Sequence, residues 1–462
     1  MHERVLDALE RLYAERVTEK LELLAHHAVR GEVWDRAARY LYQAGEKALA
    51  QSRPRAATSF FQSAVDALDH LGEGADLVLK LDALLELWVT KISTSQLEAL
   101  QEVGEKAEAL ARALNDGPRL ARVQVRQAQA LALMWLFPGT FDSAIERARE
   151  AFHRADPADL RTRGYAQFIA GVSCRDLGRL GDAIAEFGRG IALFPPGGQA
   201  GEEAGLVFPI YVSLCSWRSE VHGALGEFDA ALASAAEGLR VAGEIRHPSS
   251  LTLANAFVGY CQLLKGDIDA AIPTLERGLA IAQEHELPHG VTANLLYLAY
   301  ALILSDRRES GLEALGRAVH HQIAFMPQWT RYGTVTAGAY LAAGRIAEAT
   351  GEVDKGLAMV TERQARGYRG PLLRLQAEVL MRQEPLNAET AGERLREALA
   401  LTTELGMRPE IARCRLGLAR LHCRIGGSAA GAEHLAAAVA LFRELGATFW
   451  AERAEAEVSG PG

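Results

Sequence analysis

The sequence predicts an all-α fold, a right-handed superhelical solenoid of about ten antiparallel helix pairs with a period near 40 residues. The first observation behind this prediction is that small residues recur at fixed offsets along the chain. The second is that glycines and prolines separate the segments at nearly the same period. The third is composition: Ala, Leu, Glu and Arg are abundant, and all four form helices readily.

A repeated spacing of small residues defines the helix pairs. Leu177–Leu193, Leu225–Val241 and Lys265–Ile281 each contain a glycine, an alanine five residues later and a second glycine twelve residues after the first. The middle position extends to a register of anchors at Ala57, Leu100, Ala144, Ala183, Ala231, Ala271, Gly311, Ala349, Ala391 and Gly431. Seven residues after each anchor lies Ala or Gly, at Ala64, Ala107, Ala151, Gly190, Gly238, Gly278, Ala318, Gly356, Ala398 and Ala438. Both positions lie on one face, so they predict where the second helix of a pair packs closely against the first.

The first helix of each pair should carry its own small residue, seven before the turn glycine. It does so at Ala132, Gly171, Ser219, Gly259, Ala299, Ala337 and Ala419. Trp88 and Val379 break this rule, so their two repeats are expected to be degenerate or to follow another register.

Glycine and proline mark the predicted helix ends. Glycines that follow apolar helical stretches, where a left-handed residue ends a helix, are Gly139, Gly178, Gly226, Gly266, Gly344 and Gly426. Prolines near the starts of first helices, where they are tolerated, are Pro118, Pro157, Pro209, Pro248, Pro288, Pro327, Pro371 and Pro409. The stretch Phe194–Gly205 is expected to be a loop.

Composition excludes several classes of protein. The net charge of -9 argues against non-specific nucleic-acid binding, which needs a concentrated positive surface. No apolar run approaches the 18 residues of a membrane span, and the N-terminus lacks the apolar core of a secretion signal. The five cysteines are scattered without a C-x-x-C, which favours a reducing compartment. We therefore expect a cytoplasmic protein without a membrane partner.

The spacing of small residues resembles that of tetratricopeptide repeats, although the usual repeat has 34 residues. Longer repeats of this kind resemble the C-terminal arrays of bacterial signalling ATPases, including maltotriose-responsive transcription activators. Leu24–Val65, Arg246–Ala282, Glu404–Gly426 and Leu441–Trp450 look like the repeat tail of class III adenylate or guanylate cyclases that carry an AAA or P-loop ATPase. The resemblance implies a regulatory tail.

This resemblance carries over no catalytic chemistry. The chain has no G-x-x-x-x-G-K-[ST] motif and no Gly-Lys pair, so neither ATP binding nor cyclase activity is transferred to it. We expect residues 1–52 to be a helical segment that would join such an ATPase module, residues 53–457 to be the repeat solenoid, and residues 458–462 to be a disordered tail.

The sequence offers only weak candidates for metal-binding or catalytic side chains. His26-His27 and His320-His321 point about 100° apart on a helix, so neither pair is expected to chelate a metal. Cys414 and His422 would be about 12 Å apart along one helix, too far for one zinc, and buried cysteines are the simpler interpretation. Most carboxylates lie at helical spacing from arginines and indicate solvated faces. We expect no enzyme activity, cofactor or metal.

The inner face of a solenoid is its usual binding surface. Counting from the turn glycines predicts that the inward-facing residues are Arg126, Tyr165, Arg175, Glu220, Tyr260, Tyr300, Arg331 and Arg420. They either line a groove for a peptide, a partner helix or a small effector, or they only pack between repeats.

The sequence thus predicts a non-catalytic interaction and regulatory scaffold. Its partner would be a protein or an upstream ATPase or cyclase module, and nucleic acid is not expected. The alternative is a sensor that binds a small effector in the concave groove. An enzyme is the third, least supported hypothesis.

Overall fold

The computed structural model describes residues 1–51, 53–93, 100–134, 141–195, 209–322 and 329–459, and over these ranges it is helical without a strand. The N-terminal helices are α1 (His2–Leu12), α2 (Leu21–Arg30), α3 (Trp34–Ala50), α4 (Pro54–Leu71), α5 (Leu77–Ser93), α6 (Leu100–Ala113), α7 (Gly117–Gln129) and α8 (Phe141–Arg154). The next are α9 (Leu160–Asp176), α10 (Leu180–Ile191), α11 (Ile210–Leu225), α12 (Phe228–Glu244), α13 (Pro248–Lys265), α14 (Ile268–Glu284), α15 (Pro288–Leu304) and α16 (Arg308–Gln322). The last are α17 (Trp329–Ala342), α18 (Ile346–Glu362), α19 (Arg366–Leu380), α20 (Ala388–Glu404), α21 (Arg408–Arg424), α22 (Ser428–Glu444) and α23 (Thr448–Ser459).

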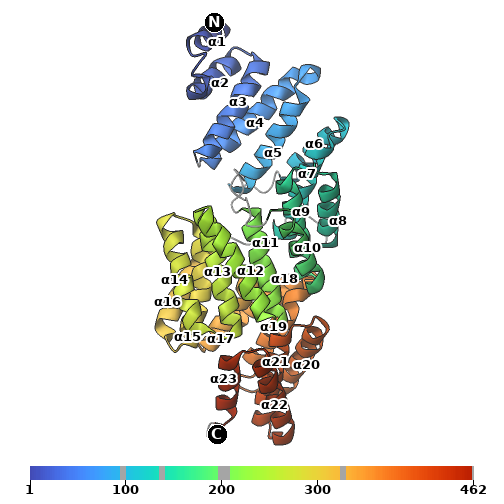
Figure 1. Ribbon diagram of the computed structural model, residues 1–462, viewed down its shortest axis with the longest axis vertical. Coiled ribbons are helices and arrows are strands. Elements are labelled where there is room, and N and C mark those ends of the chain that lie inside the picture. The colour runs from blue at the N-terminus through green and yellow to red at the C-terminus, as the bar shows by residue number, and fades with distance from the viewer. Residues whose placement is uncertain (52, 94–99, 135–140, 196–208, 323–328, 460–462) are drawn as a thin grey trace. The chain divides into compact units, whose positions relative to one another are not determined.

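Consecutive helices form the antiparallel pairs that the sequence predicts, from α3–α4 to α21–α22 (Figure 1). Every anchor lies in the second helix of a pair, in the even-numbered helices α4 to α22, and every anchor is buried. The small residues seven positions later are buried as well. The prediction of a helical-repeat solenoid is therefore confirmed.

Close packing explains why these positions must be small. A Cβ built on Gly171 would lie 2.4 Å from the Phe187 ring of α10, and one on Gly259 would lie 2.5 Å from Leu275 of α14. The exception at Trp88 has the same cause on the opposite helix. The Trp88 ring of α5 packs on Gly104 of α6, where a Cβ would lie 2.3 Å from it. In this pair the small residue lies on the second helix instead of the first, and the two helices still pack closely.

Glycines in the left-handed region end several first helices. The φ angles are +83° at Gly178, +83° at Gly226, +98° at Gly266, +71° at Gly344 and +82° at Gly426, so these predicted helix ends are confirmed. Pro118, Pro248, Pro288 and Pro409 lie in first turns, as predicted, whereas Pro371 lies inside α19. Gly139, Pro327 and the predicted loop from residue 196 onward lie outside the described residues.

The chain divides into two compact units. Unit 1 comprises Met1–Leu131, Trp135–Gly139 and Glu146–Ala166, and unit 2 comprises Ala132–Met134, Thr140–Ile145 and Gln167–Gly462. Unit 1 thus holds both the N-terminal segment 1–52 and the first helix pairs. The two units are described separately below.

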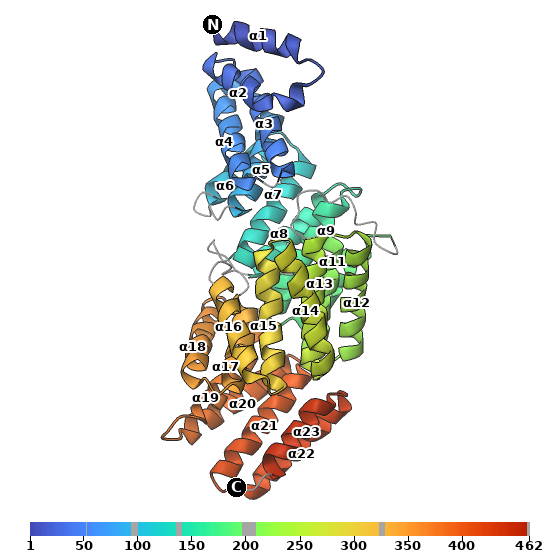
Figure 2. The same cartoon turned by 90° about the vertical axis from the view of Figure 1, so that its left-hand side faces the viewer.

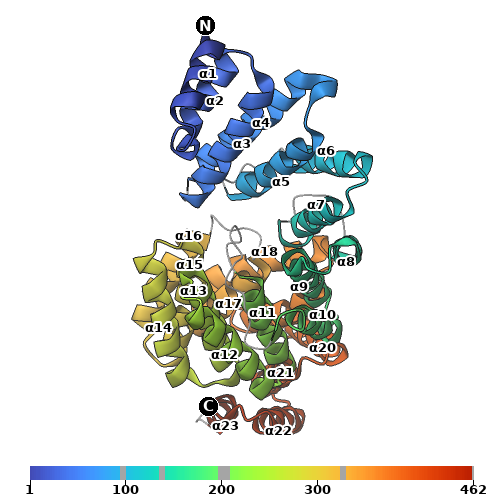
Figure 3. The same cartoon turned by 45° about the horizontal axis from the view of Figure 1, so that its top comes forward.

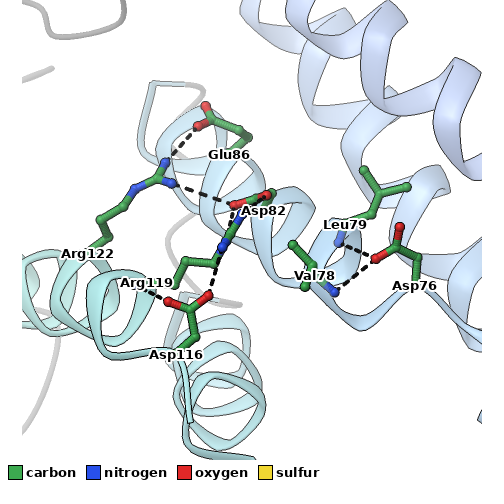
Figure 4. Close-up of polar contacts among 8 residues, drawn as sticks. All are labelled: Asp76, Val78, Leu79, Asp82, Glu86, Asp116, Arg119 and Arg122. Atoms are coloured by element: carbon green, nitrogen blue, oxygen red, sulfur yellow. Dashed lines mark hydrogen bonds and ion pairs between the residues drawn. The ribbon is translucent and has the colours of Figure 1, made fainter. Parts of the chain in front are cut away.

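An ion-pair network joins α5 to α7 in unit 1 (Figure 4). Arg119 donates from Nε to Asp82 Oδ1 at 2.8 Å and from Nη1 to Asp116 Oδ2 at 2.7 Å. Asp116 also caps α7 by accepting from the backbone N–H of Arg119, while Arg122 lies 3.6 Å from Asp82 and from Glu86. These side chains are between 18% and 40% exposed, so solvent partly screens the network.

In unit 2 the first helices form the inner layer. α11, α13, α15, α17, α19 and α21 contact one another in sequence, and each second helix packs between the first helix of its own pair and that of the next (Figure 2). Helices that lie closest together are on the concave side of a curved array. The view in Figure 3 shows α12 and α14 outside α11 and α13. Because α15 is covered by neighbours on both sides, it is buried almost throughout from Gly290 to Leu304.

Unit 2 winds until its first and last helix pairs meet. The turn at Gly178 approaches Leu405 and the start of α19, the turn at Gly226 approaches Pro409 and Leu445, and the turn at Gly266 approaches Phe449 and Trp450. The Trp450 indole Nε1 donates to the carbonyl oxygen of Leu264 at 3.1 Å. In each case a first helix meets the helix ten further along the chain: α9 with α19, α11 with α21 and α13 with α23. We call this line of contacts the seam.

None of the helices within the described ranges has the length and apolar character that crossing a membrane requires.

Candidate functional site

The eight residues predicted to face inward fall into both units. Arg126 and Tyr165 belong to unit 1, where the Arg126 guanidinium lies over the Tyr165 ring at 5.5 Å and donates to Gln129 Oε1 at 3.3 Å. Burial lowers the pKa of Arg126. The other six lie in unit 2, where two adjoining charged clusters contain Arg175, Glu220, Arg331 and Arg420. Tyr260 and Tyr300 line a cavity beside them.

The first cluster is a buried ion-pair network centred on Glu220 of α11. Glu220 Oε2 accepts from Arg175 Nη1 and from Arg331 Nη1, both at 3.2 Å. Glu220 Oε1 accepts from the Tyr368 hydroxyl at 3.0 Å. Burial favours the protonated carboxyl, but the Arg175 and Arg331 guanidiniums prevail and hold the pKa of Glu220 below its usual value. The four side chains come from α9, α11, α17 and α19, so the network ties together helices far apart in sequence.

The charges of this network are balanced. Arg175 also donates from Nε and Nη2 to Asp176 Oδ1 at 2.8 and 2.7 Å, so two arginines face two carboxylates. The Arg331 guanidinium lies over the rings of Trp217, Phe257 and Tyr332 at 5.3, 4.9 and 4.7 Å. Ring faces and Glu220 together compensate its loss of water. The charges of this cluster are therefore compensated within the protein, and Arg175, Glu220, Arg331 and Tyr368 also line a cavity.

The second cluster lies on α19 and α21 and consists of arginines and glutamates. Arg374 donates to Glu410 Oε2 at 2.7 Å and to Glu378 Oε1 at 2.6 Å. Arg413 donates to Glu410 Oε1 at 2.6 Å, and Arg420 lies 3.6 Å from Glu378. Burial would raise the pKa of Glu410, but Arg374 and Arg413 lower it to about 2. Both glutamates are thus ionised, and three arginines surround them.

Two cavities connect the clusters. One has a volume of about 170 Å³ and is lined by Tyr260, Tyr300 and the second cluster. The other has a volume of about 90 Å³ and is lined by Arg175, Glu220, Arg331 and Tyr368. Both are lined by Tyr260, Leu264, Thr334, Glu410 and Arg413, so they adjoin. We call the two cavities together the inner groove.

Sequence reasoning found part of this groove. Of the eight predicted residues, Arg175, Glu220, Tyr260, Tyr300, Arg331 and Arg420 line it. It missed Tyr368 and Arg374, which lie on α19, because the small-residue rule fails there at Val379 and gave no reliable register. It missed Glu378, Glu410 and Arg413, because carboxylates and arginines at helical spacing were interpreted as solvated. A first helix is covered by neighbouring helices on both sides, so a carboxylate and an arginine at that helical spacing are buried there. Cys414 is buried, as expected, whereas Cys423 is exposed.

Within the part of the chain that the structure describes, no group of three or more His, Cys, Asp or Glu residues is arranged to hold a metal ion. The groove offers arginine donors, glutamate acceptors and tyrosine rings. Such groups can donate to, accept from and pack against a ligand that carries polar groups.

Comparison with known proteins shows the fold. No family model matches the sequence, and no curated protein matches it. A Rap protein complexed with competence and sporulation factor is 15% identical, has a TM-score of 0.56, and the match covers 80% of this chain and 98% of the Rap chain. The Rap conjugation gene regulator of plasmid pLS20, in complex with the Phr* peptide, is 12% identical with a TM-score of 0.50, covering 82% and 98%.

The expectation of a cyclase or ATPase repeat tail is therefore wrong, because the solved structures similar to this chain are Rap-type regulators. The segments on which that resemblance rested contain the small residues at which two helices pack closely. Any solenoid with this geometry requires them, so they do not distinguish one repeat family from another. At these identities, the comparison establishes that the chain shares the helical-repeat fold of the Rap proteins.

Proposed function

We propose that this protein is a non-catalytic regulatory scaffold that binds a peptide in the inner groove of unit 2. The observation that carries the proposal is the groove itself, in which Tyr260 and Tyr300 lie beside the arginines and glutamates of α19 and α21. Tyrosine and arginine are the residue types that most often dominate binding energy at interfaces.

The dimensions of the groove favour an extended peptide. Pockets for drug-sized ligands usually have volumes of about 300–1,000 Å³, whereas the two cavities have about 170 and 90 Å³. Each cavity suits a single side chain or terminal group, and because they adjoin, one chain can reach both. The two Rap structures that share the fold are, by their descriptions, complexes with competence and sporulation factor and with the Phr* peptide.

A regulatory role follows from where the groove residues originate. Helices α9 and α11 begin the turn of unit 2, and α19 and α21 end it, yet side chains from all four line one cavity. A ligand there contacts both ends of the turn and can favour one arrangement of the seam over another. Such a preference between two states is what a ligand needs to regulate a partner.

A small effector is the second candidate, supported by the 170 Å³ cavity alone, which would hold one compact molecule. This candidate predicts a rise in melting temperature with a panel of small acids and no enrichment of peptides.

The test uses immobilised full-length protein and a mixture of short random peptides. We expect a subset of sequences to be enriched, and calorimetry with the most enriched peptide to give a dissociation constant near the micromolar range. Tyr300→Ala should weaken binding by about tenfold or more, because Tyr300 lines the groove. The control is Tyr340→Ala, a half-buried tyrosine of α17 that does not line it. No enrichment, or equal loss in both variants, would contradict the proposal.

A further inference from the structure

The first helices of unit 2 present inward-facing residues at a fixed place in the repeat, eleven residues before the small anchor of the second helix. In five first helices the residue at this place lines the inner groove, and we call these five the inner ladder: Glu220 of α11, Tyr260 of α13, Tyr300 of α15, Gly338 of α17 and Arg420 of α21. In α19 the place is held by Leu380, which is not one of the groove residues. Four members of the inner ladder carry long side chains, whereas Gly338 carries none.

Neither helix packing nor backbone conformation explains a glycine at position 338. Gly338 lies inside α17 and does not have the positive φ of the turn glycines. A Cβ built on it would lie 3.7 Å from the Tyr300 hydroxyl and 4.0 Å from Leu375, which are ordinary contact distances. On Gly259 of α13, by contrast, a Cβ would lie 2.5 Å from Leu275. Because glycine inside a helix is less favourable than alanine, Gly338 leaves open space at a cost in stability.

The space beside Gly338 belongs to the cavity of about 170 Å³. Val335 and Leu341 lie three residues to either side of Gly338, on the same face of α17. Together with Leu304 and Leu375 they give this part of the cavity a buried, apolar wall. A cavity of about 150 Å³ accepts a benzene-sized molecule, so the space has room for one aromatic ring.

Tyr300 borders this space and has unused contacts. Its neighbour in the inner ladder, Tyr260, stacks on Tyr297 with ring centroids 4.6 Å apart. Within the described residues, Tyr300 has neither a ring partner of this kind nor a hydrogen-bond partner for its hydroxyl. Burial raises the pKa of Tyr300, so the hydroxyl stays protonated and can donate. A second ring placed against Tyr300 would gain the contact energy of an aromatic pair in addition to burial.

We infer that the ligand supplies the side chain that position 338 lacks, so that an aromatic side chain of the bound peptide enters the cavity over Gly338 and packs against Tyr300 and Leu375. This inference rests on the proposed function, and it names the residue type that the groove selects. A glycine lets the main chain of a ligand approach the helix closely. An aromatic side chain supplies a large contact area at little cost in conformational entropy.

The experiment uses two mixtures of short random peptides, one with all amino acids and the other without Phe, Tyr and Trp. Immobilised full-length protein captures peptides from each mixture. We expect the complete mixture to yield peptides with an aromatic residue at one fixed position, and the depleted mixture to yield no comparably bound peptide. In calorimetry, replacing that aromatic residue by alanine should weaken binding by about tenfold or more.

Variants of the protein place the ring. Gly338→Leu fills the space, so it should weaken the aromatic peptide by about tenfold or more and leave its alanine form nearly unchanged. Gly338→Ala adds only a Cβ at ordinary contact distance and should fold and bind nearly as wild type. Gly351→Leu is the matched control, since Gly351 lies inside α18, has nothing within 4 Å of its Cβ position and does not line the cavity.

The outcomes separate the inference from the proposed function. If peptides from both mixtures bind equally well and Gly338→Leu binds them as wild type does, the aromatic inference is wrong and the peptide groove stands. An aromatic preference that persists in Gly338→Leu, or enrichment of leucine or isoleucine instead of an aromatic residue, would overturn the inference as well. If neither mixture yields a bound peptide, both proposals are overturned. The comparison of the aromatic peptide with its alanine form on the wild-type protein needs no variant to fold.

Discussion

The ion-pair networks of units 1 and 2 use the same residue types in different surroundings. In unit 1, Asp82 and Arg119 are 37 residues apart, come from neighbouring first helices, and are 22% and 29% exposed. In unit 2, Glu220 and Arg331 are 111 residues apart and are 6% and 4% exposed. Winding of unit 2 brings distant helices together and buries charges that would otherwise be solvated. The same residue types are therefore partly screened by solvent in one unit and largely desolvated in the other, where each charge depends on its partner.

The largest difference in stability between the two units is expected when a central carboxylate is removed from each network in turn. Glu220→Ala leaves Arg175 and Arg331 buried without it and should destabilise unit 2 by about 3–5 kcal/mol. Asp82→Ala should change stability by about 1 kcal/mol or less, because its partners remain solvated. Because a repeat array need not unfold in one step, the measurement is hydrogen exchange of α9, α11, α17 and α19 against α5 and α7. Equal loss of protection from hydrogen exchange in Glu220→Ala and Asp82→Ala would contradict the expected difference in stability between the two units.

Acid should weaken unit 2 through Glu410. Its folded pKa of about 2 lies below the ordinary value of 4.5, so its contribution is present above pH 4.5 and is lost as the pH falls toward 2. The loss amounts to about 3 kcal/mol. Urea unfolding at a series of pH values measures it, and Glu410→Gln should flatten the dependence. An unchanged pH dependence in that variant would show that Glu410 is not the group responsible.

A smaller effect on stability distinguishes the backbone strain of alanine at a turn glycine from the loss of packing across the seam. Gly226 and Gly446 both lie in unit 2 and both have positive φ, +83° and +67°, so alanine is strained at either position by about 1 kcal/mol. A Cβ on Gly226 would lie 2.7 Å from Leu445, whereas a Cβ on Gly446 meets nothing within 4 Å. Gly226→Ala should therefore cost about 1–3 kcal/mol more than Gly446→Ala.

Hydrogen exchange at α21 and α22 reads the seam directly, since these helices lie across it from Gly226. The expected result is faster exchange there in Gly226→Ala than in the control, Gly446→Ala. If Gly226→Ala and Gly446→Ala behave alike, the seam adds nothing to stability.

Local features of this fold were predictable from the sequence, and its long-range closure was not. The spacing of small residues predicted every second helix from α4 to α22, because two close helices need small side chains wherever they occur. Turn glycines predicted helix ends because only the local backbone decides them. The contact of Trp450 with Leu264 joins residues 186 apart, and no periodic pattern encodes it.

The residues of the inner groove were likewise predictable only where the local sequence decides their position. Arg175, Glu220 and Arg331 could be placed on inner faces by counting from turn glycines. Tyr368 and Arg374 were missed, since they lie on α19, whose repeat breaks the small-residue rule at Val379 and gave no reliable register. The family resemblance misled for a related reason, because it rested on packing positions that many repeat arrays share.

The most direct test of the central claim is hydrogen exchange of the full-length protein with and without the most enriched peptide. The account predicts slower exchange in α13, α15, α19 and α21, which line the inner groove, and no change in α5 and α7 of unit 1. Protection confined to unit 1, or to the outer helices α12, α14 and α16, would contradict the assignment of the inner groove as the peptide site.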